Sequence, residues 1–265
     1  MSKGTLVDLA KCIGCRGCQV SCKEWNQLPV VKTTCQGTYE NPIKHDDRTF
    51  AKIRFIEGEH DQNFFWKFVS KQCMHCLEPA CVSACLVKAL EKTAQGPVIY
   101  HEDLCIGCRY CMLACPFDVP KFEYSKLLPR IRKCTHCFDR QQEGMMPACN
   151  KTCPTGALRF GERQELLDVA KSRIYGEPDR YVHHIYGEHE AGGTGWLYIS
   201  DIPFEKLGLR TDISVTPYPA FTKAFLTTVP LVLMGGAGLL TGLHWFVKRR
   251  EEISKAEADK IQQEV

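Results

Sequence analysis

The sequence predicts an α+β fold made of two tandem modules of one repeated type, followed by a single C-terminal transmembrane helix. Two observations lead to this prediction. Four groups of four cysteines recur between residues 12 and 153, and each group begins CxxC and ends CxxxC. A run of 24 residues without a formal charge, residues 224–247, is long enough to cross a bilayer as one helix.

The cysteines favour metal binding over a disulfide scaffold. Cysteine makes up 17 of the 265 residues, and the chain opens MSKGTLVDLA, without the basic and apolar regions of a secretory signal. Cysteines at two- and three-residue gaps are typical of metal loops. The four groups are Cys12, Cys15, Cys18, Cys22; Cys73, Cys76, Cys81, Cys85; Cys105, Cys108, Cys111, Cys115; and Cys134, Cys137, Cys149, Cys153. Cys35 stands outside them and is expected to be a buried apolar residue or a free thiol.

The spacing within the groups fits paired 4Fe-4S clusters. One CxxCxxCxxxC loop can bind three irons of one cluster, while its fourth cysteine binds the neighbouring cluster. Pro116 and Pro154 follow the last cysteine of groups three and four, as in bacterial ferredoxins, whereas Lys23 and Leu86 stand there in the other two groups. The sequence therefore predicts four 4Fe-4S clusters in two bacterial-ferredoxin-like modules.

Zinc is the competing metal, because CMHC and CTHC are also zinc-knuckle patterns. A third cysteine in the same tight loop would be surplus at a zinc site, and two copies of CxxCxxCxxxC argue against zinc. His75 and His136 lie inside CxxC loops, but each group already has four cysteines. We expect these histidines to lie beside the ligands or at the surface and not to bind metal.

The formal charge of +3 changes when clusters are counted. Four oxidised clusters at about −2 each would bring it to about −5. Cations beside the cysteines are expected to compensate this charge and tune the clusters, not to bind nucleic acid. They are Lys11, Arg16, Lys23, Lys71, Arg109 and Lys133.

Each part of the chain has an expected role. The first module comprises residues 1–35 and 124–175 and encloses the second, residues 71–123. β-prone segments follow groups two, three and four at residues 97–103, 119–124 and 157–162. The insertion at residues 36–70 contains FAKIRFIEG and NFFWKFVS, which suggest a hairpin, and ERQELLDVAKSRI has helical spacing. Residues 176–216, including a strand WLYIS, are expected to cover the clusters or contact a partner, and an ordinary loop and strand is the equal alternative.

The C-terminal run, within an anchor at residues 217–250, is expected to span the membrane. Lys248, Arg249 and Arg250 follow it, so the positive-inside rule places the charged tail, residues 251–265, in the cytoplasm. Gly238 and Gly242 belong to a small-residue face suited to a partner helix. His244 could be imagined as a haem ligand, but an interfacial role is the favoured interpretation.

The sequence contains no pattern of a substrate site. Catalytic Ser/His/Asp patterns, phosphate loops and dinucleotide fingerprints are not visible. This favours a non-catalytic conductor of single electrons.

The four spacings, the opening VDLAKCIGCRGCQVSCKEWN and the C-terminal run resemble the iron–sulfur β subunit of membrane-bound respiratory formate dehydrogenases. The wider family includes the four-cluster subunits of molybdopterin oxidoreductases and periplasmic hydrogenases. The resemblance covers residues 5–250, and every ligand cysteine is present. GEHEAGGTGWLYISDIPFEKL is also similar to hydrogenase-linked members, which stay an alternative.

The resemblance implies that group one pairs with group four and group two with group three. Four ligand sets follow. They are Cys12, Cys15, Cys18 and Cys153 (cluster 1); Cys22, Cys134, Cys137 and Cys149 (cluster 2); Cys73, Cys76, Cys81 and Cys115 (cluster 3); and Cys85, Cys105, Cys108 and Cys111 (cluster 4).

The resemblance also implies partners and a location. The electron source would be a catalytic molybdenum- or tungsten-pterin subunit, or a NiFe hydrogenase subunit. The acceptor would be an integral membrane cytochrome b that reduces quinone. The cluster domain would lie on the periplasmic side of the inner membrane, exported with the catalytic subunit's twin-arginine signal.

Overall fold

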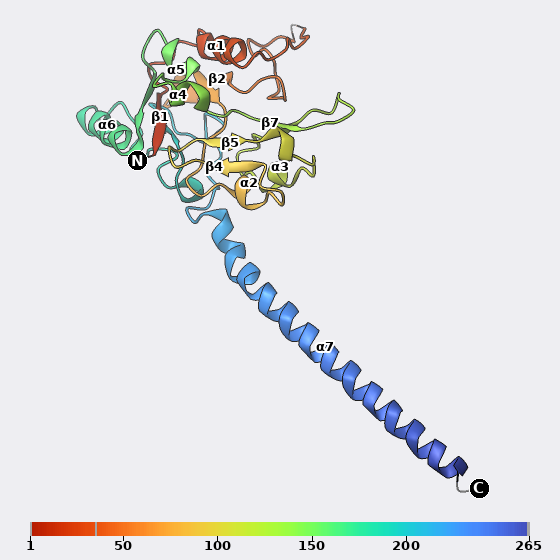
Figure 1. Ribbon diagram of the computed structural model, residues 1–265. Coiled ribbons are helices and arrows are strands. Elements are labelled where there is room, and N and C mark those ends of the chain that lie inside the picture. Colours follow the sequence, from red (N-terminus) through yellow and green to blue (C-terminus); the bar gives the residue numbers. More distant parts are fainter. Residues whose placement is uncertain (1, 35, 264–265) are drawn as a thin grey trace. The chain divides into compact units, whose positions relative to one another are not determined.

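The computed structural model describes residues 2–34 and 36–263, with side chains described up to residue 256. The chain divides into two units, Met1–Pro219 and Ala220–Val265. The first unit is a mixed domain of short helices and strands, and the second is one long helix (Figure 1).

A three-stranded sheet of order β8-β1-β9 joins distant parts of the first unit. Its central strand, β1 (Lys3–Asp8), is antiparallel to β8 (Leu158–Glu162) and parallel to β9 (Trp196–Ile199). A Cβ atom on Gly4 would lie 2.4 Å from the carbonyl oxygen of Gly195, so glycine is needed for this close approach. The sheet brings the segment before cysteine group one beside the segment after group four.

Three two-stranded antiparallel sheets complete the strands of the described residues. The longest is the hairpin of β2 (Lys52–His60) and β3 (Asn63–Lys71), which lies in the insertion where the apolar-aromatic segments predict one. The other two are β4 (Leu90–Lys92) with β5 (Val98–Tyr100), and β6 (Lys121–Phe122) with β7 (Ile131–Arg132). The strands of both pairs are much shorter than β2 and β3. Cysteine group two precedes the first pair, group three lies between the two pairs, and group four follows the second, so little chain is left for strands.

Short helices follow the cysteine loops. They are α1 (Gly17–Trp25), α2 (Ala80–Ser83), α3 (Tyr110–Ala114), α4 (Phe138–Gln142) and α5 (Ala148–Lys151), with 3-10 turns at Glu102–Leu104 and Glu190–Gly192. Helix α1 packs against α5, and α2 packs against α3. The helices of groups one and four are therefore neighbours, as are those of groups two and three.

The core has two apolar layers on either side of the central sheet. Leu6 packs towards α6 (Arg163–Gly176), which buries Leu166 and Ala170. The next residue, Val7, packs into an aromatic cluster with Trp196 and Tyr198. This alternation follows from the two-residue period of a strand, and it makes β1 the centre of the unit.

The structure tests the secondary elements expected outside the cysteine loops. The helix at ERQELLDVAKSRI is confirmed as α6, and the strand at WLYIS is confirmed as β9. All four residues of β9 are buried, so this strand belongs to the core sheet. The strand expected at residues 97–103 ends at Tyr100. The strand expected at residues 119–124 has only two residues, because the chain turns into the next loop directly after it.

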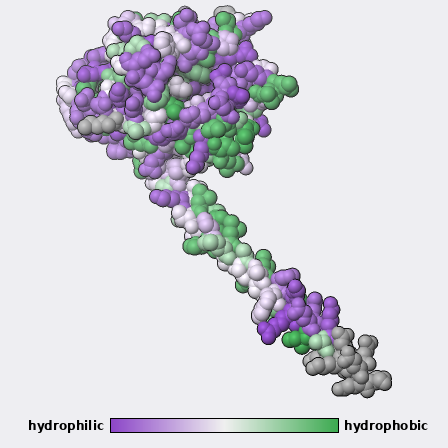
Figure 2. Space-filling model, in the orientation of Figure 1, coloured by the Kyte–Doolittle hydropathy of each residue, from purple (hydrophilic) through white to green (hydrophobic). Residues whose placement is uncertain are grey.

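The second unit consists of helix α7 (Tyr218–Gln263) from Ala220 onward. Within Tyr218–Ala256, an 18-residue window has a mean hydropathy of 1.7, and none of that window is buried. Length and composition make the helix a candidate membrane span. Hydrophobic surface covers much of its length and gives way to hydrophilic surface beyond (Figure 2). The hydroxyls of Thr227 and Thr241 donate to the carbonyls of Ala224 and Ala237, which satisfies them within the helix.

The carboxylate of Asp8 anchors the end of β1 and supplies a test of the fold. It is fully buried and accepts hydrogen bonds from Arg173 at 2.8 Å and from the Tyr181 hydroxyl at 3.1 Å. Replacing Arg173 with Met removes the closer cation from this buried charge and leaves only Lys11, which is 3.9 Å away and 41% exposed. Because Arg173 is itself partly exposed, we expect a loss of about 2 to 3 kcal/mol in unfolding free energy, below the usual cost for a fully buried pair.

Thermal unfolding of the full chain followed by circular dichroism measures this effect. The control is Arg180→Met, since Arg180 pairs with Glu177 at the surface and should change the unfolding temperature little. Equal shifts in the two variants would contradict the anchoring role of Asp8.

Candidate metal centres in the cysteine loops

The loops of groups one and three have the same left-handed geometry. Gly14 and Arg16 have φ angles of 67° and 60°, and Gly107 and Arg109 have 70° and 65°. Such turns point successive backbone amides into the loop, where they can bind anionic sulfur. Groups two and four use His75, His136 and Cys137 at positive φ instead. The repeated letters of the sequence therefore encode a repeated backbone shape.

The sixteen patterned cysteines carry no disulfide, and of these only Cys15 and Cys108 are exposed. Cys35 lies outside the described residues, and its role stays a prediction. The structure gathers the other cysteines into four neighbourhoods, each drawing on two sequence groups.

The first neighbourhood is a cavity lined by Cys12, Cys15, Cys18 and Cys153. Burial, together with the charges of the other three thiols, raises the pKa of Cys18 to about 12. Group-one and group-four cysteines thus meet around one space, next to the end of the central sheet.

The second neighbourhood contains Cys22, Cys134, Cys137 and Cys149. Burial raises the pKa of the Cys134 thiol well above its usual range, and the charges of Cys22, Cys73, Cys137 and Cys149 add to this. The amide of His136 donates to the sulfur of Cys134 at 3.2 Å.

The third neighbourhood contains Cys73, Cys76, Cys81 and Cys115. Burial raises the pKa of Cys76 well above its usual range, and the charges of the other three raise it again. Cys73 and Cys115 also pack in one apolar cluster with Cys22 and Cys134.

The fourth neighbourhood contains Cys85, Cys105, Cys108 and Cys111. Burial raises the pKa of Cys111 to about 12, as do the charges of Cys85, Cys105 and Cys108. Burial also raises the pKa of Cys105, but the Tyr100 hydroxyl, the amides of Ile131 and Gly107 and the cation of Arg130 outweigh it, and the net pKa is lowered. The amide of Ala89 donates to the sulfur of Cys85 at 3.1 Å.

This arrangement suits an iron–sulfur cluster better than a single ion. Among the described residues, no three His, Cys, Asp or Glu side chains are close enough to hold one metal ion. Thiolates around one zinc lie only about 3.8 Å apart, given a Zn–S bond of about 2.3 Å, whereas a cluster separates its ligands by its own width. Crowded buried thiols also resist ionisation, and bound iron supplies the positive charge that stabilises thiolates.

His75 and His136 are buried structural residues. Their rings stack at 5.0 Å between centroids, the Val98 amide donates to Nδ1 of His75, and Nε2 of His136 lies 3.0 Å from the Thr5 hydroxyl. Burial lowers the pKa of His136 to about 3 and that of His75 well below its usual value. The expectation that they lie beside the ligands fits, and a surface location is wrong. Both histidines hold the same position in a CxHC loop, and this is the sequence signal from which their contact could have been predicted.

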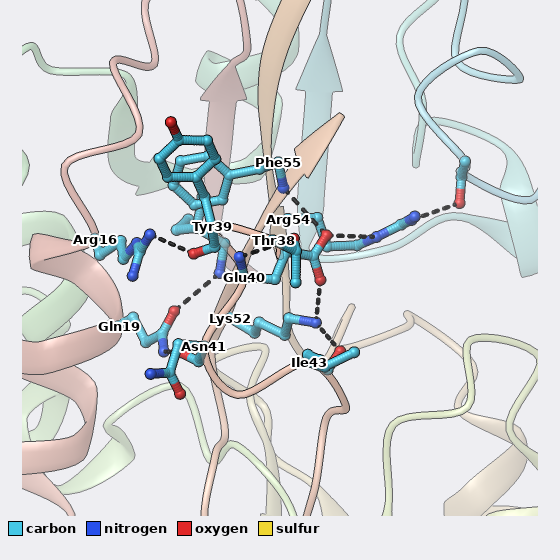
Figure 3. Close-up of polar contacts among 12 residues, drawn as sticks. Arg16, Gln19, Thr38, Tyr39, Glu40, Asn41, Ile43, Lys52, Arg54 and Phe55 are labelled. Carbon is cyan, nitrogen blue, oxygen red and sulfur yellow. Dashed lines mark hydrogen bonds and ion pairs between the residues drawn. The ribbon is translucent and has the colours of Figure 1, made fainter. Parts of the chain in front are cut away.

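The insertion fixes helix α1, which carries Cys18 and Cys22 (Figure 3). Glu40 binds the ammonium of Lys52 and accepts a hydrogen bond from the Phe55 amide, while Arg16 donates to the carbonyl of Tyr39. Gln19 extends the contact by donating to the Asn41 carbonyl at 2.7 Å and accepting from the Ile53 amide at 3.2 Å. The hairpin and its leading loop thereby hold the first cysteine loop in position.

These loops, with their converging thiols and inward amides, define a 4Fe-4S protein. A family model for the 4Fe-4S dicluster domain matches residues 64–163. A protein of Nitratidesulfovibrio vulgaris is 42% identical over 269 aligned positions, covering all of this chain and 72% of the relative.

Two named relatives specify the family. The nitrate-inducible formate dehydrogenase iron–sulfur subunit of Escherichia coli K12 is 36% identical, covering 90% of this chain and 82% of its own length. The Hydrogenase-2 operon protein HybA of E. coli O157:H7 is 36% identical, covering 78% of this chain and 73% of its own length. The chain belongs to the family of iron–sulfur subunits that includes these proteins.

Gly14 provides a test of the loop geometry. A Cβ atom there would lie 2.7 Å from the Phe68 ring, while one on Gly144, which has a similar φ, meets nothing within 4 Å. Both Gly14→Ala and Gly144→Ala carry the strain of a left-handed alanine, but only the first displaces a cysteine loop. We expect Gly14→Ala to lose about one cluster's iron and Gly144→Ala to keep the wild-type content, as measured by iron analysis of the purified chain. Equal iron content in the two variants would refute the argument.

Proposed function

We propose that this chain carries four 4Fe-4S clusters and relays electrons from a catalytic molybdenum- or tungsten-pterin subunit, as in formate dehydrogenase, to a membrane cytochrome b that reduces quinone. Membership of the iron–sulfur subunit family supports electron transfer as its role. The chain itself is non-catalytic in this proposal. The HybA relative favours a second candidate, in which the electron source is a NiFe hydrogenase subunit.

The four neighbourhoods support the ligand sets given above as clusters 1 to 4. Each set takes three cysteines from one loop and one from the partner loop, or the reverse. Bound there, each cluster would supply a site that accepts and releases one electron. The protein's own residues would fix the thiolates, exclude water and aim amides at the sulfurs.

The observation that carries the proposal is that cysteines of successive sets pack in shared apolar clusters. They are Cys18 and Cys153 with Cys149, then Cys22 and Cys134 with Cys73 and Cys115, then Cys81 with Cys85, Cys105 and Cys111. We infer that the four sets follow one another as a line. The charges of Cys22 and Cys18 both act on Cys149, which links the first set to the second. The charge of Cys73 acts on Cys134, linking the second to the third, and that of Cys111 acts on Cys81, linking the third to the fourth. Of the sixteen described cysteines, the two exposed ones, Cys15 and Cys108, belong to the first and last sets, so each of these sets has an accessible cysteine.

The two ends have different surfaces. Around the fourth set, exposed apolar side chains gather: Leu86, Leu104, Ile106, Leu113, Leu127 and Leu128. Hydrophobic surface is visible on the side where α2, α3 and β7 lie (Figure 2). Around the first set, the exposed apolar side chains are Ile13, Val20, Tyr39 and Trp66. Both ends carry an arginine over an aromatic ring, Arg16 at the first set and Arg109 at the fourth, so the difference is the larger number of exposed aliphatic side chains at the fourth set. We assign the end at the fourth set to the membrane subunit and the end at the first set to the catalytic subunit.

Iron analysis and EPR test the cluster count and the pairing. The purified chain should contain about sixteen irons and show several interacting signals on reduction. Cys12→Ala and Cys153→Ala should alter the same signal, whereas Cys149→Ala, in the same sequence group as Cys153, should alter another. Far fewer irons, zinc in their place, or a shared signal for Cys149 and Cys153 would contradict the proposal.

The proposed location is the inner membrane, with α7 crossing once and the cluster domain on the periplasmic side. Lys248, Arg249 and Arg250 near the end of the candidate span support a cytoplasmic C-terminus. Protease added to spheroplasts should cleave the cluster domain and spare the tail. The reverse pattern would overturn this topology.

The partner is tested by purifying the complex in mild detergent and assaying its metals. Molybdenum or tungsten is expected. Nickel would instead select the hydrogenase candidate.

A further inference from the structure

Two lysine side chains converge on the second cysteine group. Lys133 follows β7 and is only 2% exposed, and Lys92 ends β4 and is partly buried. Buried lysines are rare unless their charge is paired. The sequence predicts Lys133 only as one of six cations beside the cysteines, and it assigns no role to Lys92.

Their ammonium groups bond only to backbone carbonyls. Nζ of Lys133 donates to the carbonyls of Val98 and Cys134, both at 2.6 Å. Nζ of Lys92 donates to the carbonyl of His75 at 3.1 Å and to that of Gly96. Within residues 2–34 and 36–256, neither lysine forms an ion pair with a carboxylate. A buried charge in this position needs an anion that the side chains alone do not supply.

Both lysines interact with thiols of the third set through their charges. Burial lowers the pKa of Lys92 to about 8, while the charges of Cys76 and Cys73 act to raise it. The charge of Lys133 acts to lower the pKa of Cys81, another thiol of the third set. Geometry supports this placement. Lys92 donates to the carbonyl of His75, inside the loop between Cys73 and Cys76, and Lys133 donates to the carbonyl of Val98, whose amide binds the His75 ring.

The other sets have weaker cations near them. Lys23 beside Cys22 is partly exposed and donates to the carbonyl of Arg48, and Arg130 beside Cys105 is 36% exposed and pairs with Glu102. In the first set, the charges that shift the pKa of Cys18 come only from other cysteines and not from a cation. Asp118 opposes the lysines at Cys115, but it is 71% exposed and pairs with Lys121.

We propose that Lys92 and Lys133 are the resident countercharges of the third cluster and make it the most readily reduced of the four. This inference rests on the proposed function and its ligand sets. When one electron enters from the preceding cluster, the third cluster becomes more negative by one charge and no bond forms or breaks. Two ammonium groups in a low dielectric stabilise that added charge, and the electron then leaves to the next cluster.

The test is an EPR-monitored redox titration of the purified chain and its variants. Lys133→Met and Lys92→Met should each lower one midpoint potential by at least a tenfold change in the reduction equilibrium constant, about 59 mV for a one-electron couple. That signal should be the highest-potential one in the wild type and the one altered by Cys81→Ser. The other three potentials should shift less.

Three variants separate charge from packing. Lys133→Arg and Lys92→Arg keep the charge and should restore the wild-type potential. Lys11→Met removes a lysine that adjoins Cys12 but is 41% exposed and faces Asp8, and it should shift no potential appreciably.

Lys92→Met with full iron content and an unchanged potential overturns the inference, as does an equal shift of all four signals. Failure of the proposed function looks different, because the wild type itself would then lack four reducible clusters. The lysine result is judged only after the wild-type iron content is known.

Discussion

Neutralisation of crowded, buried thiolates is the interaction on which this structure depends. Burial raises the pKa of cysteines in all four neighbourhoods, and neighbouring thiols raise one another's pKa further. Without a positive centre among them, the thiols would stay protonated and would make only weak contacts. Bound iron changes their charge and ties distant parts of the chain together, so metal binding is coupled to folding.

The small amount of regular structure follows from this constraint. Several cysteines are themselves members of the apolar clusters, as Cys22, Cys73 and Cys134 are around Phe50 and Val119. Loops that must point amides inward cannot also form long strands, which explains two-stranded sheets of two or three residues per strand. The one extended sheet lies outside the cysteine loops, where β1 closes the N-terminal segment onto residues after group four. Metal ligation and this sheet therefore fix the same long-range connection.

The sequence predicts features that depend on local pattern. The apolar-aromatic segments FAKIRFIEG and NFFWKFVS predict the hairpin, and helical spacing at Leu166, Leu167 and Ala170 predicts α6. The sequence does not predict the long-range pairing of strands, because nothing in WLYIS indicates that it lies parallel to β1. The partly buried Glu40 and Lys92 and the stacking of His75 on His136 were also missed, since such contacts depend on partners more than ten residues away.

The same electrostatic constraint explains why the inner and outer ends of the line are built differently. Near the exposed Cys15 and Cys108, water and mobile ions can respond to an added electron, so turns rich in amides suffice. Deeper in the domain that response is lost, and the stabilising charge has to be part of the fold. Lys133, 2% exposed and tied to two carbonyls, is such a fixed charge. On the proposed ligand sets, burial therefore places the strongest attraction for an electron inside the line, where it can hold an electron between arrival at one end and departure at the other.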